Sequence, residues 1–134
     1  MLTCASFFAG VGGIDLGFEN TKYFKVIYAN EFDKFPATTY ENNSKIKVDC
    51  RDIREVQPDD VPDVDLIMGG FPCQAFSVAG YRQGFDDEKG RGTLFFELMR
   101  IIKAKQPKIV FLENVKNLVG HDNGNTFKVI TEAL

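Results

Sequence analysis

A thiol and a carboxylate each follow a short apolar segment, and together they could form a reactive site. Cys73 follows a Gly-Gly-Phe-Pro segment at 69–72, directly after the apolar run 64–68. The glycines allow a sharp turn and close approach of a ligand, and the proline fixes its own φ. The backbone that carries the thiol is therefore rigid. A thiol of this kind acts as a nucleophile when it ionises. Glu113 follows a second apolar run, 108–112.

The alternative for Cys73 is a buried, unreactive core residue, which is the common state of free cysteines. A core cysteine does not need a preceding Gly-Gly-x-Pro segment, so this segment favours the interpretation of Cys73 as a reactive thiol. Apart from Asp65 and Lys108, runs 64–68 and 108–112 are apolar, as in parallel strands that are buried on both faces. Because open α/β sheets bind ligands at the carboxyl ends of their strands, we predict that Cys73 and Glu113 face one crevice.

The remaining pattern predicts an α/β fold with a Rossmann-like, doubly wound and mostly parallel sheet. Residues 57–63, with two prolines and three aspartates, are a predicted loop. A helix capped by Thr93 is predicted to end before Pro107, and another begins near Thr126 with Asn125 as its cap. Further strands are predicted at 3–8, 25–29 and, as a short element, 45–48, with helices from residue 14 and over 33–41.

A glycine-rich segment at 8–13, called here the glycine turn, lies between the first predicted strand and its helix. This order is the arrangement of nucleotide-binding sites, although a tight turn alone would have the same pattern. Glu31 lies 18 residues after Gly13 at the tip of strand 25–29, where an acid typically grips ribose hydroxyls. A solvated charge or a helix-initiating acid is the alternative for Glu31. An acid within 49–52 could reach an adenine-like base edge.

Composition limits the functional classes. A length of 134 residues suits one domain, and a net charge of −3 argues against a protein that binds nucleic acid over its whole surface. Three cysteines without a C-x-x-C pair and a single histidine argue against a metal site. We find no membrane-spanning run and no signal peptide, so a cytoplasmic location is expected. The polar segment 77–92, with four glycines, is predicted to be a lid, with simple disorder as the alternative.

Four segments in order resemble the DNA (cytosine-5) methyltransferases, especially those of bacterial restriction–modification systems. Phe8–Gly13 resembles the cofactor motif of that family, and Gly70–Ser77 resembles its nucleophile motif. Arg91–Phe96 resembles the segment that opens the intervening helix, and Glu113–Val115 resembles the glutamate motif. The resemblance covers essentially the whole chain. It implies the fold of S-adenosylmethionine-dependent methyltransferases, incomplete at its C-terminal side.

The resemblance also implies a reaction. The Cys73 thiolate would attack C6 of a flipped cytosine, C5 would take a methyl group from S-adenosylmethionine, and loss of the C5 proton would expel the cysteine. Glu113 would hold the base at N3 and its amino group, and segment 77–92 would close over it. The implied substrate-binding residues are Gln74, Ser77 and Asn114. The implied cofactor-binding residues are Phe8, Gly10, Gly12, Glu31, Phe32, Asp52, Ile53, Gly70, Pro72 and Leu94.

The chain departs from the family pattern by what it lacks. The family's target-recognition region, an arginine-bearing motif and the last cofactor-closing segments lie later and are not in this sequence. We therefore interpret residues 1–134 as a cofactor-binding and catalytic domain that acts on duplex DNA with a C-terminal complement or second subunit. Strand 108–112 would then be an uncovered sheet edge. Alternatives are an RNA (cytosine-5) methyltransferase, a non-catalytic cofactor-binding module and, more weakly, a nicotinamide dehydrogenase.

Overall fold

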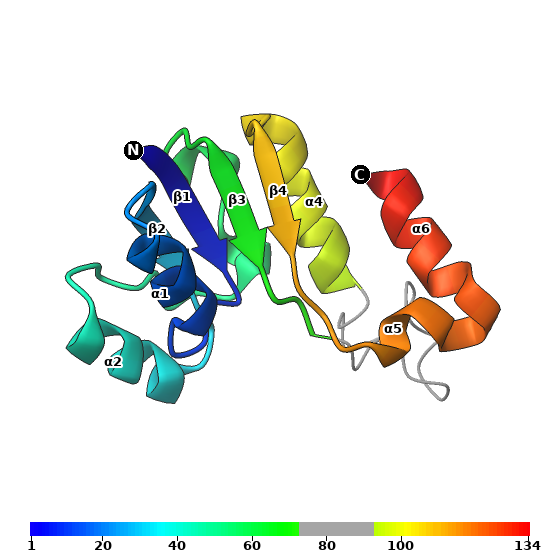
Figure 1. Cartoon of the computed structure of the whole chain (residues 1–134), viewed down its shortest axis with the longest axis horizontal. Helices are drawn as coiled ribbons and strands as arrows, with labels where there is room; N and C mark the ends of the chain where they lie inside the picture. The colour runs from blue at the N-terminus through cyan, green and yellow to red at the C-terminus, as the bar shows by residue number, and fades with distance from the viewer. Residues whose placement is uncertain (73–92) are drawn as a thin grey trace.

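Four parallel strands form the centre of the structure, a computed structural model that describes residues 1–72 and 93–134. The strands are β1 (Leu2–Phe7), β2 (Phe24–Asn30), β3 (Leu66–Gly69) and β4 (Ile109–Leu112). Their order in the sheet is β2-β1-β3-β4, so β1 is central and β4 lies at an edge (Figure 1). These elements confirm the strands predicted at 3–8, 25–29, 64–68 and 108–112.

Helices cover both faces of this sheet because the central strands are apolar on both sides. On one face, Phe7 and Ile67 pack in the same cluster as Leu98 of helix α4 (Thr93–Lys105). On the other face, Cys4 and Leu66 pack against helix α1 (Gly13–Asn20). The chain thus crosses over in opposite directions after β1 and after β3, which makes the sheet doubly wound and leaves a switch point between these two strands. This arrangement confirms the predicted fold class.

The segment after β2 differs from prediction in one element. Helix α2 (Lys34–Asn43) forms as predicted, with the Asp33 carboxylate accepting a hydrogen bond from the amide of Phe35 at 3.0 Å. The strand predicted at 45–48 is wrong, since only an isolated bridge between Asn30 and Asp49 forms there. Side chains take the place of a strand ladder: the amide of Val48 donates to the Glu41 carboxylate at 2.8 Å. Two short 3₁₀ turns follow, η1 (Ile53–Glu55) and η2 (Pro58–Asp60).

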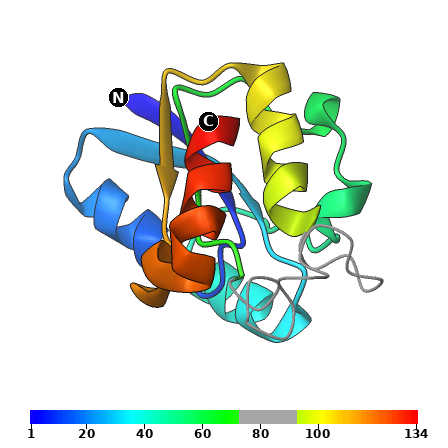
Figure 2. The same cartoon turned by 90° about the vertical axis from the view of Figure 1, so that its right-hand side faces the viewer.

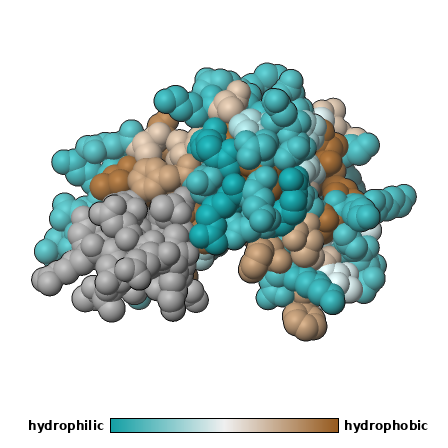
Figure 3. All heavy atoms as spheres, turned by 180° about the vertical axis from the view of Figure 1, so that it is seen from behind, coloured by the Kyte–Doolittle hydropathy of each residue, from teal (hydrophilic) through white to brown (hydrophobic). Residues whose placement is uncertain are grey.

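Three helical segments follow β4 and stand beyond it at the open edge of the sheet (Figures 1 and 2). They are α5 (Asn117–Gly120), η4 (His121–Gly124) and α6 (Asn125–Ala133). Helix α6 confirms the prediction, but its cap is Gly124, at φ +85°, and Asn125 is already its first residue. The predicted capping side chain of Thr93 lies outside the described residues. On the rear of the molecule hydrophilic residues predominate (Figure 3).

One carboxylate ties the amino ends of three strands together, and removal of its cationic partner gives a testable pH effect. Asp65 accepts hydrogen bonds from the Lys108 ammonium at 2.7 Å and the Thr3 amide at 3.0 Å. Lys108, and then Thr3, hold the pKa of Asp65 at about 2. Because the folded-state pKa is below the unfolded value, this contribution is complete above roughly pH 4 and is lost as the pH falls further.

We expect Lys108→Met to reduce the loss of stability on acidification between roughly pH 4 and pH 2. Urea unfolding at a series of pH values measures this slope for the free energy of unfolding. Lys128→Met is the matched control, because the Lys128 amine lies 3.8 Å from Glu132 at an exposed site. Equal slopes for the two variants and the unmodified chain would refute the prediction.

Candidate active site

The carboxyl ends of all four strands meet at one edge of the sheet and present the predicted site residues there. The glycine turn follows β1, Glu31 follows β2, Gly70 follows β3 and Glu113 follows β4. The strand pairing fixes this alignment, because Phe7 pairs with Gly69 and Gly69 pairs with Leu112. The strand ends at which the crevice is predicted therefore lie side by side.

The ends of β3 and β4 are tied together by backbone and side-chain contacts. The amide of Glu113 donates to the carbonyl of Gly69 at 3.0 Å, and the Asn114 side-chain amide donates to the carbonyl of Phe71 at 2.8 Å. A Cβ atom built on Gly70 would lie only 3.2 Å from Oε2 of Glu113. The lack of a side chain at Gly70 thus lets the carboxylate lie against the backbone that leads to Pro72.

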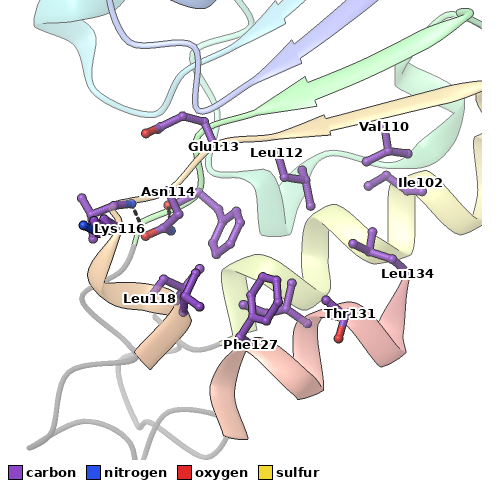
Figure 4. A pocket seen from close by; sticks show the side chains of 14 residues that line it. Ile102, Val110, Leu112, Glu113, Asn114, Lys116, Leu118, Phe127, Thr131 and Leu134 are labelled. Carbon is purple, nitrogen blue, oxygen red and sulfur yellow. Dashed lines mark hydrogen bonds between the residues drawn. The ribbon is translucent and has the colours of Figure 1, made fainter. Parts of the chain in front are cut away.

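Glu113 is exposed and available to a ligand. Its side chain points away from Leu112, Leu118 and Phe127, although Glu113 lines the same groove as these residues (Figure 4). Pro72 is half-buried at the end of the described segment. Of the site residues predicted around the nucleophile motif, Cys73, Gln74 and Ser77 lie outside the described residues, as does the predicted lid at 77–92.

The glycine turn is held open by a backbone conformation that glycine adopts easily. Gly10 and Gly12 have φ values of +56° and +91°, and Phe8, which is half-buried, has φ +52°. The amide of Gly10 donates to Oε1 of Glu31 at 3.0 Å, and the other carboxylate oxygen accepts from the Asp33 amide at 2.7 Å. Glu31 therefore touches the turn directly, and its carboxylate lies where the sequence predicted a ribose-binding acid.

The residues predicted to surround the adenine lie after β2 and at the start of η1. Phe32 is 69% exposed, so its ring is open to a ligand. Asp52 accepts hydrogen bonds from the Arg54 backbone at 2.9 Å and from its guanidinium at 2.7 Å, and Arg54 lowers the pKa of this carboxyl. The side chain of Ile53 is buried in the core, so its backbone alone could meet a cofactor. Leu94 is half-buried against the same core.

Asn30 at the end of β2 is a supporting residue that the sequence analysis missed. Its side-chain amide donates to the carbonyls of Asp49 and Arg51, each at 2.8 Å, and its backbone carbonyl accepts from the amide of Ala9 at 3.1 Å. Asn30 is buried. It thus joins the glycine turn to the loop that carries Asp52. In the sequence, the only sign of this role is an asparagine at the tip of an apolar strand.

The same loop is held from below by Tyr28, whose hydroxyl donates to the Asp49 carboxylate at 2.6 Å. Burial, and the hydrogen bond to Asp49, raise the pKa of Tyr28. The Arg51 guanidinium bonds both oxygens of Asp49 at 2.7 and 2.8 Å and lowers the pKa of that carboxyl. These contacts give the rim of the crevice a fixed shape without using Glu31 or Asp52.

A second missed group is Asp15, which lies beneath the glycine turn and is 4% exposed. Its carboxylate accepts hydrogen bonds from the Ser6 hydroxyl at 2.8 Å and the Tyr40 hydroxyl at 2.5 Å. Burial raises the pKa of Asp15. In the sequence this acid has the pattern of an ordinary residue in the first turn of a helix. Its buried hydrogen bond to Tyr40, 25 positions later, is seen only in the structure.

Within residues 1–72 and 93–134, no helix is both long and apolar enough to cross a membrane. The same ranges hold no group of three or more His, Cys, Asp or Glu side chains placed to bind a metal ion.

Comparison with known proteins gives the chain a family. The sequence profile of the C-5 cytosine-specific DNA methylases matches residues 2–134. The type II methyltransferase M.Bsp6I of Bacillus sp. (strain RFL6) is 65% identical over 134 residues, which are 100% of this chain and 42% of that protein. The type II methyltransferase M1.ScrFI of Lactococcus lactis subsp. cremoris is 53% identical over 95% of this chain and 32% of its own length.

Solved structures show the same fold. The Dnmt2 methyltransferase of S. pombe superimposes with a TM-score of 0.78 at 18% identity, covering 98% of this chain and 42% of its own. The DNMT2 of Spodoptera frugiperda gives a TM-score of 0.74 at 21% identity, covering 99% of this chain and 41% of its own. The chain thus spans less than half the length of these relatives. By its sequence match over residues 2–134, the chain belongs to the C-5 cytosine-specific DNA methylase family.

Proposed function

We propose that residues 1–134 form the cofactor-binding and catalytic part of a DNA (cytosine-5) methyltransferase of a restriction–modification system. The observation that carries the proposal is the contact between Glu113 and Gly70. It puts an exposed carboxylate against the backbone that leads to Cys73, at the same strand edge as the glycine turn. A structural acid would need no glycine beside it, whereas an acid that must reach a substrate next to a thiol does.

S-adenosylmethionine fits the residues that surround the glycine turn. The amide of Gly10 is already bonded to the Glu31 carboxylate, and residues 8–13 contain no basic side chain. Such a turn disfavours a phosphate, so it suits a nucleoside without phosphates better than a dinucleotide. Glu31 would bind the ribose, Phe32 would stack on the adenine and Asp52 would lie at the base edge. Bound there, S-adenosylmethionine supplies the methyl group.

The protein's own groups would carry the rest of the reaction. The Cys73 thiolate donates its electron pair to C6 of the cytosine, which makes C5 nucleophilic towards the methyl group. Transfer of the C5 proton to solvent water then leaves its electron pair to restore the C5–C6 double bond, and the C6–S bond breaks to release the thiolate. Glu113 would hold N3 and the amino group of the base, stabilising charge that develops on the ring as C6 is attacked. A stacked base is out of reach, so the cytosine must leave the duplex.

The test is a chimera in which this chain replaces the matching segment of M.Bsp6I. We expect the chimera to transfer labelled methyl groups to duplex DNA, and Cys73→Ser to abolish the transfer. Cys4→Ala is the matched control, because Cys4 is a buried thiol within β1 and not at the strand ends that carry the proposed site. A duplex that carries fluorine at C5 of the target should trap a covalent complex with the unmodified chimera, because C5 then lacks the proton that must leave.

The possible outcomes distinguish the alternative functions. Preferential methylation of transfer RNA over duplex DNA would favour RNA as the substrate. Methyl transfer that survives Cys73→Ser would contradict the mechanism. A chimera that binds S-adenosylmethionine but methylates neither substrate would support a cofactor-binding module.

We propose further that the complement of this chain adds a strand to β4. In parallel strands, alternate residues direct their backbone groups to opposite neighbours. The amides of Ile109 and Glu113 donate to β3, so those of Val110 and Leu112 face the open edge. Ile109 and Phe111, which are 43% and 41% exposed, leave apolar surface on that strand. Uncovered edges of this kind recruit another strand.

Apolar grooves flank this edge on both faces of the sheet. One, of about 610 Å³, lies between β4 and the helices α5 and α6 (Figure 4). The other, of about 380 Å³, lies beside α1 and is lined by Phe18, Phe24 and Phe111. A strand that pairs with β4 would project side chains alternately into both grooves. The relatives are more than twice as long as this chain, so their C-terminal part supplies a suitable occupant.

Val110→Pro tests this interface directly. Proline removes an amide that faces the open edge and leaves the pairing with β3 intact, so the chain should fold. We expect at least about tenfold weaker binding of the separately expressed C-terminal part of M.Bsp6I, measured by titration calorimetry. Val110→Ala keeps the amide and should bind more tightly than Val110→Pro, whereas Ile109→Pro breaks a bond to β3 and should destabilise the chain itself. Equal binding by Val110→Pro and the unmodified chain would refute the proposal.

A further inference from the structure

A buried carboxylate beneath the glycine turn has no part in the proposed chemistry. Asp15 projects from α1, and its two oxygens accept hydrogen bonds from β1 and α2, through Ser6 at 2.8 Å and Tyr40 at 2.5 Å. Among the described residues, the ion pairs do not include Asp15. Burying an acid without an ion-pair partner costs free energy, so the presence of Asp15 at this position requires an explanation.

The partner Tyr40 explains what the carboxylate holds in place. A Cβ atom built on Gly12 would lie 2.8 Å from Cε2 and 2.9 Å from Cδ2 of the Tyr40 ring. The ring therefore packs directly against the backbone of Gly12 at the end of the glycine turn. Tyr40 is 3% exposed and clusters with Ala37 and Val48, against which Ala9 of the turn also packs.

The glycine turn is thus held from two sides by the segment that follows β2. Glu31 accepts from the amide of Gly10 at 3.0 Å, and Tyr40 supports Gly12 with its hydroxyl fixed by Asp15. Both contacts lead to residues on either side of the start of α2. A change in the position of Tyr40 would therefore shift the turn relative to Glu31, the acid proposed to bind the ribose.

We propose that Asp15 and Tyr40 are positioning residues that set the conformation of the glycine turn for cofactor binding. This inference rests on the proposed function, since it takes S-adenosylmethionine as the ligand. The carboxylate acts by accepting two hydrogen bonds in fixed directions, not by its charge. An asparagine at position 15 could accept from Tyr40 through its oxygen and donate to Ser6 through its nitrogen, so it should preserve the arrangement.

The experiment measures two properties of this chain and its variants. The first is hydrogen exchange of the Gly10 and Gly12 amides by NMR, which needs no cofactor. The second is the dissociation constant for S-adenosylmethionine. We expect Tyr40→Phe and Asp15→Ala to speed exchange at these glycines and to weaken binding, each by about tenfold. Asp15→Asn should restore both properties to near those of the unmodified chain.

Thr3→Val is the matched control for a general loss of stability. It removes hydrogen bonds of 3.2 Å between the Thr3 hydroxyl and Asp65 at the opposite end of β1. It should lower Tm without changing the two glycine amides or the dissociation constant. If Tyr40→Phe behaves like Thr3→Val, the inference is wrong and the network is only structural. If the unmodified chain does not bind S-adenosylmethionine, the proposed function fails, while the exchange measurement still decides whether Asp15 and Tyr40 fix the turn.

Discussion

Glu113→Gln is expected to reduce methyl transfer by the M.Bsp6I chimera about 10²- to 10³-fold. Glutamine keeps the shape of the side chain but cannot hold or release a proton at N3 of the base. The exposed carboxylate lies 3.2 Å from the Cβ position of Gly70 and is not part of the buried core, so replacing it with an amide should leave the fold unchanged. Single-turnover kinetics with saturating DNA would isolate the chemical step from binding.

Two other variants show whether this effect is local. Glu132→Gln alters an exposed acid near the end of α6 and should leave the rate unchanged. Gly70→Ala places a methyl group against the Glu113 carboxylate, which must then move by a few tenths of an ångström, and we expect a rate about tenfold lower. A Glu113→Gln enzyme with a normal rate would remove this residue from the reaction, and the contact with Gly70 would then be structural.

Gly12→Ala is expected to lower the free energy of unfolding by about 2–4 kcal/mol, as measured by urea denaturation. Two terms contribute. At φ +91° a side chain is strained, and the new Cβ would lie 2.8 Å from a carbon of the Tyr40 ring. Tyr40 has little room to move because its hydroxyl is bonded to the buried Asp15 carboxylate.

Gly17→Ala provides the opposite expectation in the same helix. Gly17 lies within α1, and nothing stands within 4 Å of its Cβ position. Alanine there should raise the free energy of unfolding by about 0.5–1 kcal/mol, because glycine weakens a helix interior. If both substitutions have the same sign, the special role of the Gly12 backbone is refuted.

Local patterns in the sequence suffice to predict the elements that form the crevice. The run 64–68 is apolar because β3 is buried on both faces. The run 108–112 is apolar although β4 lies at the sheet edge with Ile109 and Phe111 exposed, and the residues after both runs become the site. The strand predicted at 45–48 is wrong because side-chain hydrogen bonds, which the hydrophobic pattern does not reveal, replace pairing with another strand. Glu41 and Ser44 provide hydrogen-bond acceptors to Val48 and Ile46, so this segment needs no neighbouring strand.

The supporting residues of the site are harder to predict because their partners are distant in the chain. Asp15 has the pattern of an exposed helical acid until the fold brings Tyr40 onto it, 25 residues away. Asn30 ends a strand in an ordinary way, yet it bonds carbonyls 19 and 21 residues later. The roles proposed for Glu31 and Glu113 follow from position at strand ends, whereas those of Asp15 and Asn30 depend on three-dimensional contacts.

The central place of β1 has a consequence for synthesis on the ribosome. This strand leaves the ribosome before the other three strands of the sheet, yet it pairs with β2 on one side and with β3 on the other. The contact between Thr3 and Asp65 spans 62 residues, which take roughly 3–12 s to translate. During that interval one edge of an apolar strand has no partner. Nascent chains caught at this stage are the species from which aggregation should begin, so slower translation of residues 31–65 is expected to lower the yield of folded protein.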